Sequence, residues 1–266
     1  MTTAAARPAT LLANCAFGDD PGRWPLPAAR TPHDLWLRSV AAGGQGRYAS
    51  ALADLSRLRD AGPAPVSLAY STRASFLRQL GWHTVARGWD GRALAAAGTD
   101  PEARADALVG LAADALGVGR FAVSARLLAR AREQIVGDAA GGRLPVRQAW
   151  VDAELAMARG DGPQAVTHAE RAVAAAASFG SARHAVKSEV VLAAALCSAG
   201  AHDRSRRVAD AALDAAGRLG LIPLRWALAC LLSDIGSAAH PASRIGEIRD
   251  GSAAAVRRRG GVWRGH

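Results

Sequence analysis

The stretch TDPEARADALVGLAADALGVGRFAVSARLLARAREQI, residues 99–135, decides how this chain folds. It begins with a strong helix start, because a capping residue is followed by proline at the first helical position and then by an acid. Apolar residues recur at helical spacing until Gly117-Val118-Gly119 interrupts them, and a second such run follows Phe121. The stretch therefore predicts two helices joined by a glycine turn.

A small pattern repeats this arrangement along the chain: a glycine, a turn residue two positions later and a small residue five positions later. Successive glycines of the pattern lie 35 to 41 residues apart. The five copies are Gly46-Tyr48-Ala51, Gly81-His83-Ala86, Gly119-Phe121-Ser124, Gly160-Gly162-Ala165 and Gly200-His202-Ser205. A period in this range is typical of stacked helical hairpins. Strictly alternating apolar runs are absent, so we expect no sheet.

A second small residue lies in the first helix of each predicted hairpin, seven positions before the glycine. These five residues are Ser39, Ala74, Ala112, Ala153 and Ala193. A large side chain at either small site would hold the two helix backbones apart. We therefore expect both sites of each hairpin to lie where its helices touch.

These hairpins resemble tetratricopeptide (TPR) repeats, and in particular the helical-repeat segments of large bacterial transcription regulators. The resemblance covers about residues 31–236 and rests on the turn glycines, the small sites and the unit that contains Leu108, Phe121 and Leu128. It implies an all-α fold, a right-handed superhelical solenoid of about five TPR-like hairpins plus a terminal helix. The chain departs from the family pattern at Asp90, where a large apolar residue is expected.

Three segments are predicted from the spacing of these signals. Residues 1–30 contain four prolines and are expected to be an extended, partly ordered lead-in. Residues 31–236 form the helical repeat domain, and its last helix, residues 221–235, is expected to have no partner. Residues 237–266 form a basic segment that is expected to be partly helical or disordered.

The chain carries a net charge of +10, and Lys187 is its only lysine among 33 basic residues. A GC-rich genome explains the preference for arginine, but the positive excess still attracts acidic partners or nucleic acid. The three cysteines show no paired spacing, and no apolar run is long enough to span a membrane. We therefore expect a cytoplasmic protein.

The resemblance to TPR proteins also implies a groove lined by the first helix of each hairpin. The residues predicted to bind a partner there are Trp36, Arg78, Arg147, Trp150, Glu154, Lys187 and Trp226. Large aromatic rings beside cations suit an extended, acidic peptide. The alternative is that the tryptophans belong to the hairpin core and are one position out of register.

Two basic stretches allow more than one interpretation. The segment Arg183-His184-Ala185-Val186-Lys187 either holds an anionic group on the inner face or forms a solvated surface. The tail contains six arginines after residue 240 together with Trp263. It either contacts nucleic acid through phosphate contacts and one stacking ring, or is a disordered, solubilising end.

No motif of an enzyme is found. The chain lacks a phosphate loop, a nucleophile elbow and a dinucleotide fingerprint, and Cys197 and His202 have no second pair to complete a metal site. We predict no catalytic, metal-binding or cofactor-binding residues, and a non-enzymatic adaptor that binds a peptide or helix of another protein. The alternative is a transcription-linked regulator that contacts nucleic acid or a transcription factor through its arginine-rich surface.

Overall fold

The computed structural model describes residues 8–135 and 142–265, and every regular element within these ranges is a helix. The helices are α1 (Pro8–Phe17), α2 (Pro32–Gly44), α3 (Tyr48–Ser56), α4 (Pro63–Gln79), α5 (His83–Ala96), α6 (Pro101–Gly117), α7 (Phe121–Gln134), α8 (Arg143–Ala158), α9 (Gly162–Phe179), α10 (Ala182–Ser198), α11 (His202–Arg218), α12 (Ile222–Ile235) and α13 (Ala242–Arg258). The predicted all-α fold is confirmed for these residues.

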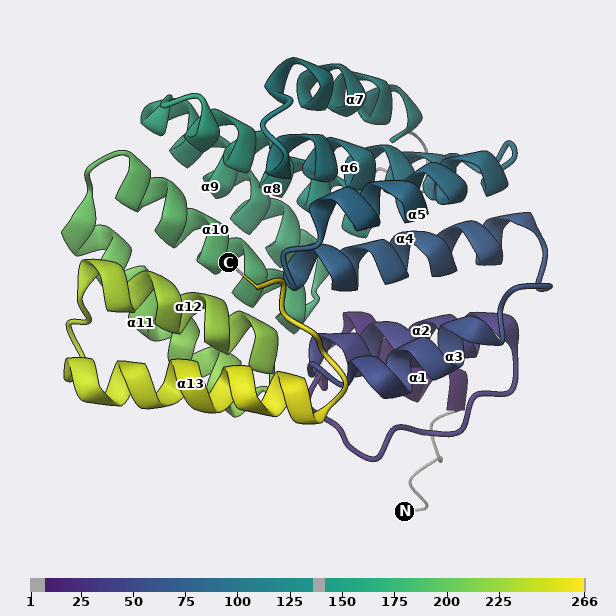
Figure 1. The fold of residues 1–266 in the computed structure, drawn as a ribbon, viewed down its shortest axis with the longest axis horizontal. Helices are drawn as coiled ribbons and strands as arrows, with labels where there is room; N and C mark the ends of the chain where they lie inside the picture. The colour runs from purple at the N-terminus through teal and green to yellow at the C-terminus, as the bar shows by residue number, and fades with distance from the viewer. Residues whose placement is uncertain (1–7, 136–141, 266) are drawn as a thin grey trace.

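Helices that are neighbours in sequence pack against each other, and together they follow a closed path in Figure 1. From α2 onward they form pairs, beginning with α2 and α3 and ending with α12 and α13. The first helix of each pair also contacts the first helix of the next, from α2 through α4, α6, α8 and α10 to α12. This continuous row of first helices forms the inner layer of the molecule.

The five predicted turn glycines all have the backbone conformation that favours glycine. Their φ angles are 73° at Gly46, 90° at Gly81, 76° at Gly119, 77° at Gly160 and 78° at Gly200. A side chain at such a φ would clash with its own backbone, so these turns need glycine. The periodic pattern therefore marks the turn between the two helices in each of these five pairs.

The ten predicted small sites are all completely buried, at 0% exposure. One hydrogen bond shows the closeness of the helices directly, because Ser205 Oγ on α11 donates to the backbone oxygen of Ala193 on α10 at 2.7 Å. The two residues are the two small sites of one hairpin. The prediction that these sites lie at the helix contact is confirmed.

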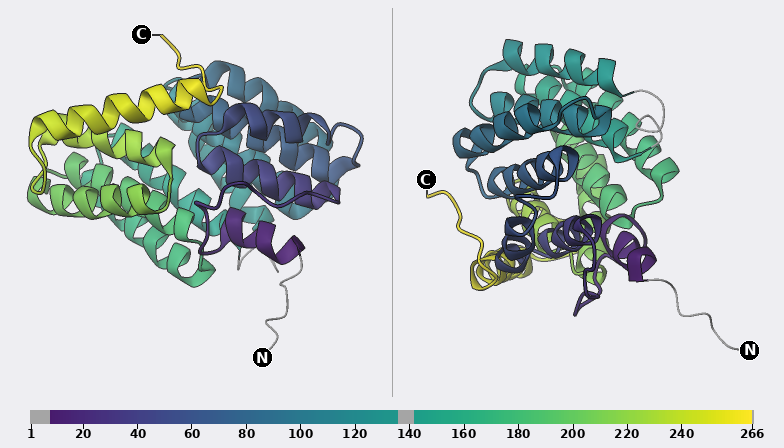
Figure 2. Two further views of the ribbon diagram at one scale, coloured as in Figure 1. Left: turned by 90° about the horizontal axis from the view of Figure 1, so that it is seen from below. Right: turned by 90° about the vertical axis from the view of Figure 1, so that its right-hand side faces the viewer.

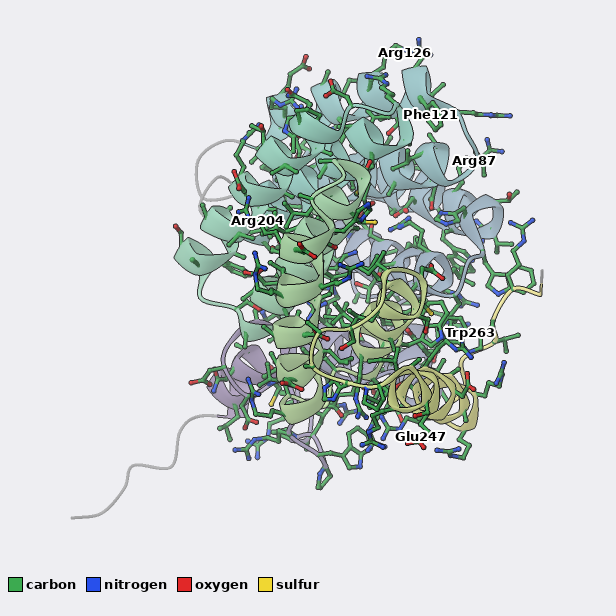
Figure 3. The ribbon with its side chains drawn as sticks, turned by 90° about the vertical axis from the view of Figure 1, so that its left-hand side faces the viewer. Arg87, Phe121, Arg126, Arg204, Glu247 and Trp263 are labelled. Carbon is green, nitrogen blue, oxygen red and sulfur yellow. The ribbon has the colours of Figure 1, made fainter. Side chains whose placement is uncertain are left out.

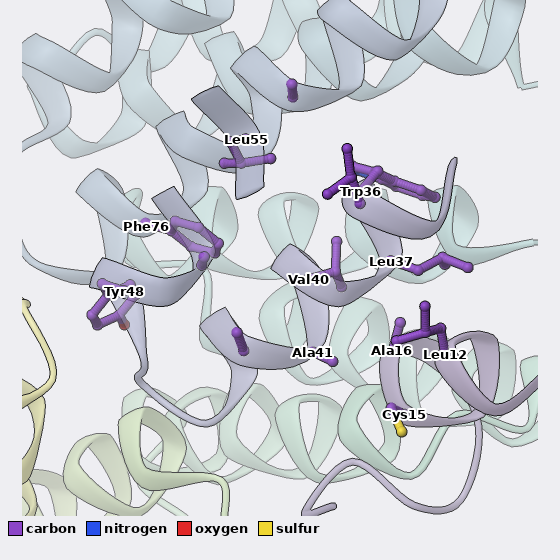
Figure 4. Close-up of a cluster of buried hydrophobic side chains, with 14 of the residues drawn as sticks. Leu12, Cys15, Ala16, Trp36, Leu37, Val40, Ala41, Tyr48, Leu55 and Phe76 are labelled. Atoms are coloured by element: carbon purple, nitrogen blue, oxygen red, sulfur yellow. The ribbon is translucent and has the colours of Figure 1, made fainter. Parts of the chain in front are cut away.

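The beginning of the chain differs from the expected extended lead-in. Pro8–Phe17 form α1, whose side chains Leu12 and Cys15 are fully buried in one cluster with Leu37 and Ala41 of α2 (Figure 4). No proline follows Pro8 until Pro21, so the residues between them are free to form a helix. The expectation of an extended segment was wrong here because a count of prolines ignores their position. Residues 1–7 lie outside the described part of the chain.

The C-terminal segment is also more ordered than expected. α13 packs along α12, so α12 has a partner, contrary to the sequence prediction. After α13 the chain runs back to the N-terminal half of the molecule, as Figure 2 shows. The backbone N–H of Ala49 donates to the oxygen of Arg259 at 3.0 Å, and that of Arg264 donates to the oxygen of Leu80 at 2.9 Å.

The other end of the chain closes the path from the opposite side. α1 contacts α10, and the backbone N–H of Ala182 donates to the oxygen of Gly18 at 3.0 Å. The inner layer is therefore enclosed by contacts between the two ends of the stack rather than left as an open groove. Of the helices described, none combines the length and apolar character needed to cross a membrane.

Candidate functional site

The inner layer of first helices surrounds a cavity of about 310 Å³. Side chains of α2, α4, α6, α8 and α10 line it, joined by Phe17 at the end of α1 and His83 at the start of α5. Pockets that enclose small ligands are roughly 300–1,000 Å³. This cavity lies at the lower end of that range, so it has room for a compact group or the end of a chain.

Most of the residues predicted to bind a partner do lie around this cavity. Of the seven predicted residues, the six that line the cavity are Trp36, Arg78, Arg147, Trp150, Glu154 and Lys187. Trp226 does not line it: its ring packs on that of Trp263, with 4.1 Å between the ring centroids. The returning C-terminal segment supplies Trp263, and no repeat pattern reveals that segment.

The two tryptophans of the cavity wall are fixed by hydroxyl groups on the neighbouring first helix. Trp36 Nε1 donates to Thr72 Oγ1 at 3.0 Å, and Trp150 Nε1 donates to Ser188 Oγ at 2.9 Å. Trp36 is buried in the core and also borders the cavity, whereas Trp150 is half-buried. The two interpretations of the tryptophans are therefore not exclusive, because core and cavity share this wall.

One side of the wall contains a buried ion cluster around Arg78, which we call the Arg78 cluster (Arg78, Asp90 and Asp114). Arg78 Nη1 donates to Asp90 Oδ2 at 2.5 Å and to Asp114 Oδ1 at 2.8 Å, and both carboxylates are fully buried. Burial raises the pKa of Asp90 to about 7, and the charge of Asp114 acts in the same direction against the opposing charge of Arg78. Two carboxylates here share one guanidinium.

The other side of the wall holds three arginines, Arg143, Arg147 and Arg183, which we call the arginine trio. Asp106 accepts a hydrogen bond from Arg143 at 2.8 Å and another from Arg147. Burial alone would raise the pKa of Asp106, but the charges of Arg143 and Arg147 outweigh burial and lower it. Glu102, which is 47% exposed, also pairs with Arg143 at 3.1 Å.

Arg183 is the member of the trio without a carboxylate. Within residues 8–135 and 142–265, its buried Nε atom has no hydrogen-bond partner and its side chain forms no ion pair. Its side chain passes Gly44, where an added Cβ would lie only 2.8 Å from Arg183 Cδ. Burial, together with the charges of Arg147 and Arg143, lowers the pKa of Arg183 to about 10. Its positive charge therefore remains in place at neutral pH and lacks compensation.

His184 lies next to the trio and is uncharged. Burial, followed by the charges of Arg183 and Arg143, holds the pKa of His184 well below its ordinary value. Its ring stacks on Trp150, with 5.3 Å between centroids, and its Nδ1 forms a hydrogen bond with Ser181 Oγ at 2.9 Å. The histidine thus fixes the position of a cavity tryptophan and adds no positive charge.

The remaining lining charges lie toward solvent. Lys187 Nζ is 3.4 Å from Glu154 Oε1, and their side chains are 31% and 34% exposed. Lys187 Nζ also lies 5.8 Å from the centroid of the Trp150 ring. Such a partly exposed pair is readily exchanged for contacts with a ligand.

Several residues of the site were not among the predicted ones. The missed lining residues are Phe17, His83, Arg143, Arg183 and His184. The charge-dense segment at residues 183–187 could have indicated them, and the structure favours the interpretation in which this segment faces the cavity over the one in which it forms a solvated surface. Asp90 was a second signal, because a carboxylate where the repeat pattern expects an apolar residue indicated a buried partner.

Many other arginines project from the outer surface, among them Arg87 and Arg126 in Figure 3. Arg204 pairs there with Glu170 at 3.0 Å, with both side chains about half exposed. In the tail, Arg259 Nη1 donates to the backbone oxygen of Gln45 at 2.7 Å. Since residues 242–265 are ordered against the body, the expectation of a disordered end is wrong for them.

Fold and cavity together define an all-α protein of repeat-like architecture, with a partly open cavity lined by arginines and aromatic rings. No protein-family model matches the chain, and no curated protein matches it. Within the described ranges, no group of three or more His, Cys, Asp or Glu side chains is placed to hold a metal ion.

Proposed function

We propose that this chain is a non-enzymatic adaptor that holds a short acidic segment of a partner protein in its central cavity. One observation carries the proposal: the cavity collects aromatic rings and arginines from four of the five first helices that line it, namely α2, α4, α8 and α10. Aromatic side chains and arginines are the residue types that dominate the energetics of protein interfaces. The enclosed wall and its fixed tryptophans give the binding site a preformed shape.

The size of the cavity favours an extended segment over a helix. A helix with its side chains is about 10–12 Å across, which needs more room than a cavity of about 310 Å³ offers. An extended chain end or an acidic side chain needs much less. We therefore narrow the peptide-or-helix prediction to an extended peptide.

The interpretation as a TPR-like protein belongs to the same proposal. The periodic glycine turns and the ten buried small sites support a right-handed stack of TPR-like hairpins. The odd number of cysteines, all three of them free, supports a reducing compartment such as the cytoplasm.

The proposal is tested by filling the cavity. Ser75 lines the cavity and is half-buried, so Ser75→Trp places an indole in the cavity without removing a charge. Ala122→Trp on the exposed face of α7 is the matched control. We expect proteins captured from the native cells by the full chain and by the control variant to include one that Ser75→Trp no longer retains. If every captured protein is retained equally by both variants, the cavity is not the binding site.

Salt dependence separates this function from the nucleic-acid alternative. Binding that depends on phosphate contacts falls by orders of magnitude between about 50 and 200 mM salt, whereas a contact made largely by apolar surface weakens much less. A captured nucleic acid that dissociates over this range, and that Ser75→Trp still binds at low salt, would indicate binding by the outer arginines. A captured protein that resists 200 mM salt would favour the cavity.

A further inference from the structure

The arginine trio carries more positive charge than the carboxylates paired with it neutralise. The arginine trio contributes three guanidinium groups, while one fully buried carboxylate, Asp106, and one half-exposed carboxylate, Glu102, pair with it. A buried charge without a partner is costly for a protein. An excess of this kind is maintained at a binding site, where a ligand supplies the missing charge.

Of the three arginines with a buried nitrogen that lacks a hydrogen-bond partner among the described residues, two belong to the trio and the third is Arg78. The buried Nε atoms of Arg183 and Arg143 have no partner in the part of the chain that the structure describes. Arg143 itself is only 7% exposed. Guanidinium groups offer paired N–H donors with a geometry that matches carboxylate and phosphate oxygens.

Aromatic rings lie beside two guanidinium groups of the trio and cover part of their surface. The Arg143 guanidinium carbon lies 5.3 Å from the centroid of the Trp36 ring, and that of Arg183 lies 5.9 Å from the centroid of Phe17. Charge-assisted hydrogen bonds are stronger where water is excluded. A group bound here would be held by its charge and by directed hydrogen bonds from the guanidinium groups.

From this geometry we infer that the arginine trio is a binding site for a single oxyanion, a carboxylate or phosphate group carried by the ligand. The inference deepens the proposed function, because the oxyanion would be the acidic group of the bound segment. Arg183 provides the free charge, while Arg143 and Arg147 are held in position by Asp106. The neutral His184 and its stacked partner Trp150 form the adjoining wall.

Arg183→Gln is the variant that tests the site with the least risk to folding. Because Arg183 has no ion pair within the described residues, its loss leaves no carboxylate unpaired and removes repulsion from Arg147 and Arg143. We expect this variant to melt at a higher temperature than the wild type in chloride buffer. A lower melting temperature would show that Arg183 is a structural residue and would overturn the inference.

The ligand response is measured with inorganic phosphate and with acetate as probes on the full chain. Each replaces sodium chloride at constant ionic strength, and thermal unfolding and calorimetric titration are recorded. We expect at least one of the two anions to stabilise the wild type above chloride, and Arg183→Gln to bind that anion about tenfold or more weakly, because it loses a charge-assisted hydrogen bond. The stronger of the two probes identifies the class of the oxyanion.

Arg126→Gln is the matched control, because Arg126 is exposed on α7 and loses the same charge. It should keep the response of the wild type. The inference fails if Arg183→Gln responds as the wild type does, or if neither phosphate nor acetate exceeds chloride. An anion response without any protein lost from Ser75→Trp would overturn only the adaptor function. Partner capture that is sensitive to Ser75→Trp but not to Arg183→Gln would overturn only the oxyanion site.

Discussion

The Arg78 cluster and the arginine trio lie in the wall of the same cavity, yet their charges are unbalanced in opposite directions. In the Arg78 cluster two fully buried carboxylates share one guanidinium. In the trio three guanidinium groups share Asp106 and the half-exposed Glu102. The first cluster corrects its imbalance internally, because the raised pKa of Asp90 allows it to hold a proton. Arginine stays charged near neutral pH, so the excess charge of the trio is met only by the neighbouring Asp90, whose charge acts on Arg147, or by an external anion.

This difference suggests separate tasks for the two clusters. The Arg78 cluster joins α4, α5 and α6 by ion pairs, and the proton on Asp90 balances its charge without a ligand, although Arg78 Nη2 has no hydrogen-bond partner among the described residues. In the trio, Asp106 joins α6 to α8, while Arg183 on α10 forms no ion pair within the described residues and its Nε donor is unused. We expect the first to stabilise the fold and the second to bind the ligand.

Replacing the shared cation of the Arg78 cluster has the largest expected effect. Arg78→Met leaves Asp90 and Asp114 buried without their partner, which should lower the free energy of unfolding by about 3–5 kcal/mol. Urea denaturation at pH 7 measures this change. Arg204→Met, which removes an exposed ion pair with Glu170, is the control and should change stability by less than about 1 kcal/mol. Equal effects of the two substitutions would show that the cluster does not support the fold.

Replacing the shared anion of the trio has the next largest effect. Asp106→Asn leaves the three arginines with Glu102 alone, and we expect a loss of about 2–4 kcal/mol in urea denaturation. Phosphate or acetate, whichever binds the wild type, should restore part of this stability, because the anion replaces the lost charge. An equal restoration in Asp90→Asn would mean that the anion does not act at the trio.

The proton on Asp90 predicts that the stability contributed by the Arg78 cluster, and not that contributed by the trio, depends on pH. Between about pH 4 and pH 7 the folded chain holds this proton and the unfolded chain has lost it. The stability that the proton on Asp90 contributes is thus fully present below about pH 4 and declines as the pH rises through the folded pKa of about 7, by up to about 1.4 kcal/mol per pH unit. Asp90→Asn should remove this decline.

The measurement for Asp90 is the difference between the wild type and Asp90→Asn in free energy of unfolding, followed from pH 5 to pH 8. His184 acts in the opposite sense, because its lowered pKa makes stability fall as pH drops below about 6.5. That contribution is common to both proteins and cancels in the difference. A difference that does not vary with pH would show that Asp90 is ionised throughout.

The smallest effect on stability is expected at the solvent side of the cavity. Lys187→Met removes a pair with Glu154 that is about one-third exposed at both ends, so the unfolding free energy should change by less than about 1 kcal/mol. Thermal unfolding measures it. A loss of more than about 2 kcal/mol in the free energy of unfolding would show that Lys187 supports the fold, and would contradict the assignment of separate structural and ligand-binding charges.

The cavity was partly predictable because helical repeats place equivalent positions on one face. Counting from the small site of each first helix brought Trp36, Trp150 and Lys187 to the inner wall, as the structure shows. The same counting failed for Trp226, since a segment outside the repeats covers that position. Arg143 and Arg183 lie at other positions of their helices, so the counting did not select them.

The sequence by itself determined the helices, the glycine turns and the close contact within each hairpin. These features depend on residues at most a few turns apart, and on two local requirements, a positive φ and a small side chain. Only the tertiary structure decided that the two ends of the stack meet, and that Arg78 faces Asp114 while Arg183 pairs with no carboxylate of residues 8–135 and 142–265. Such pairings join residues tens of positions apart, and they depend on how small rotations between successive helices add up around the molecule.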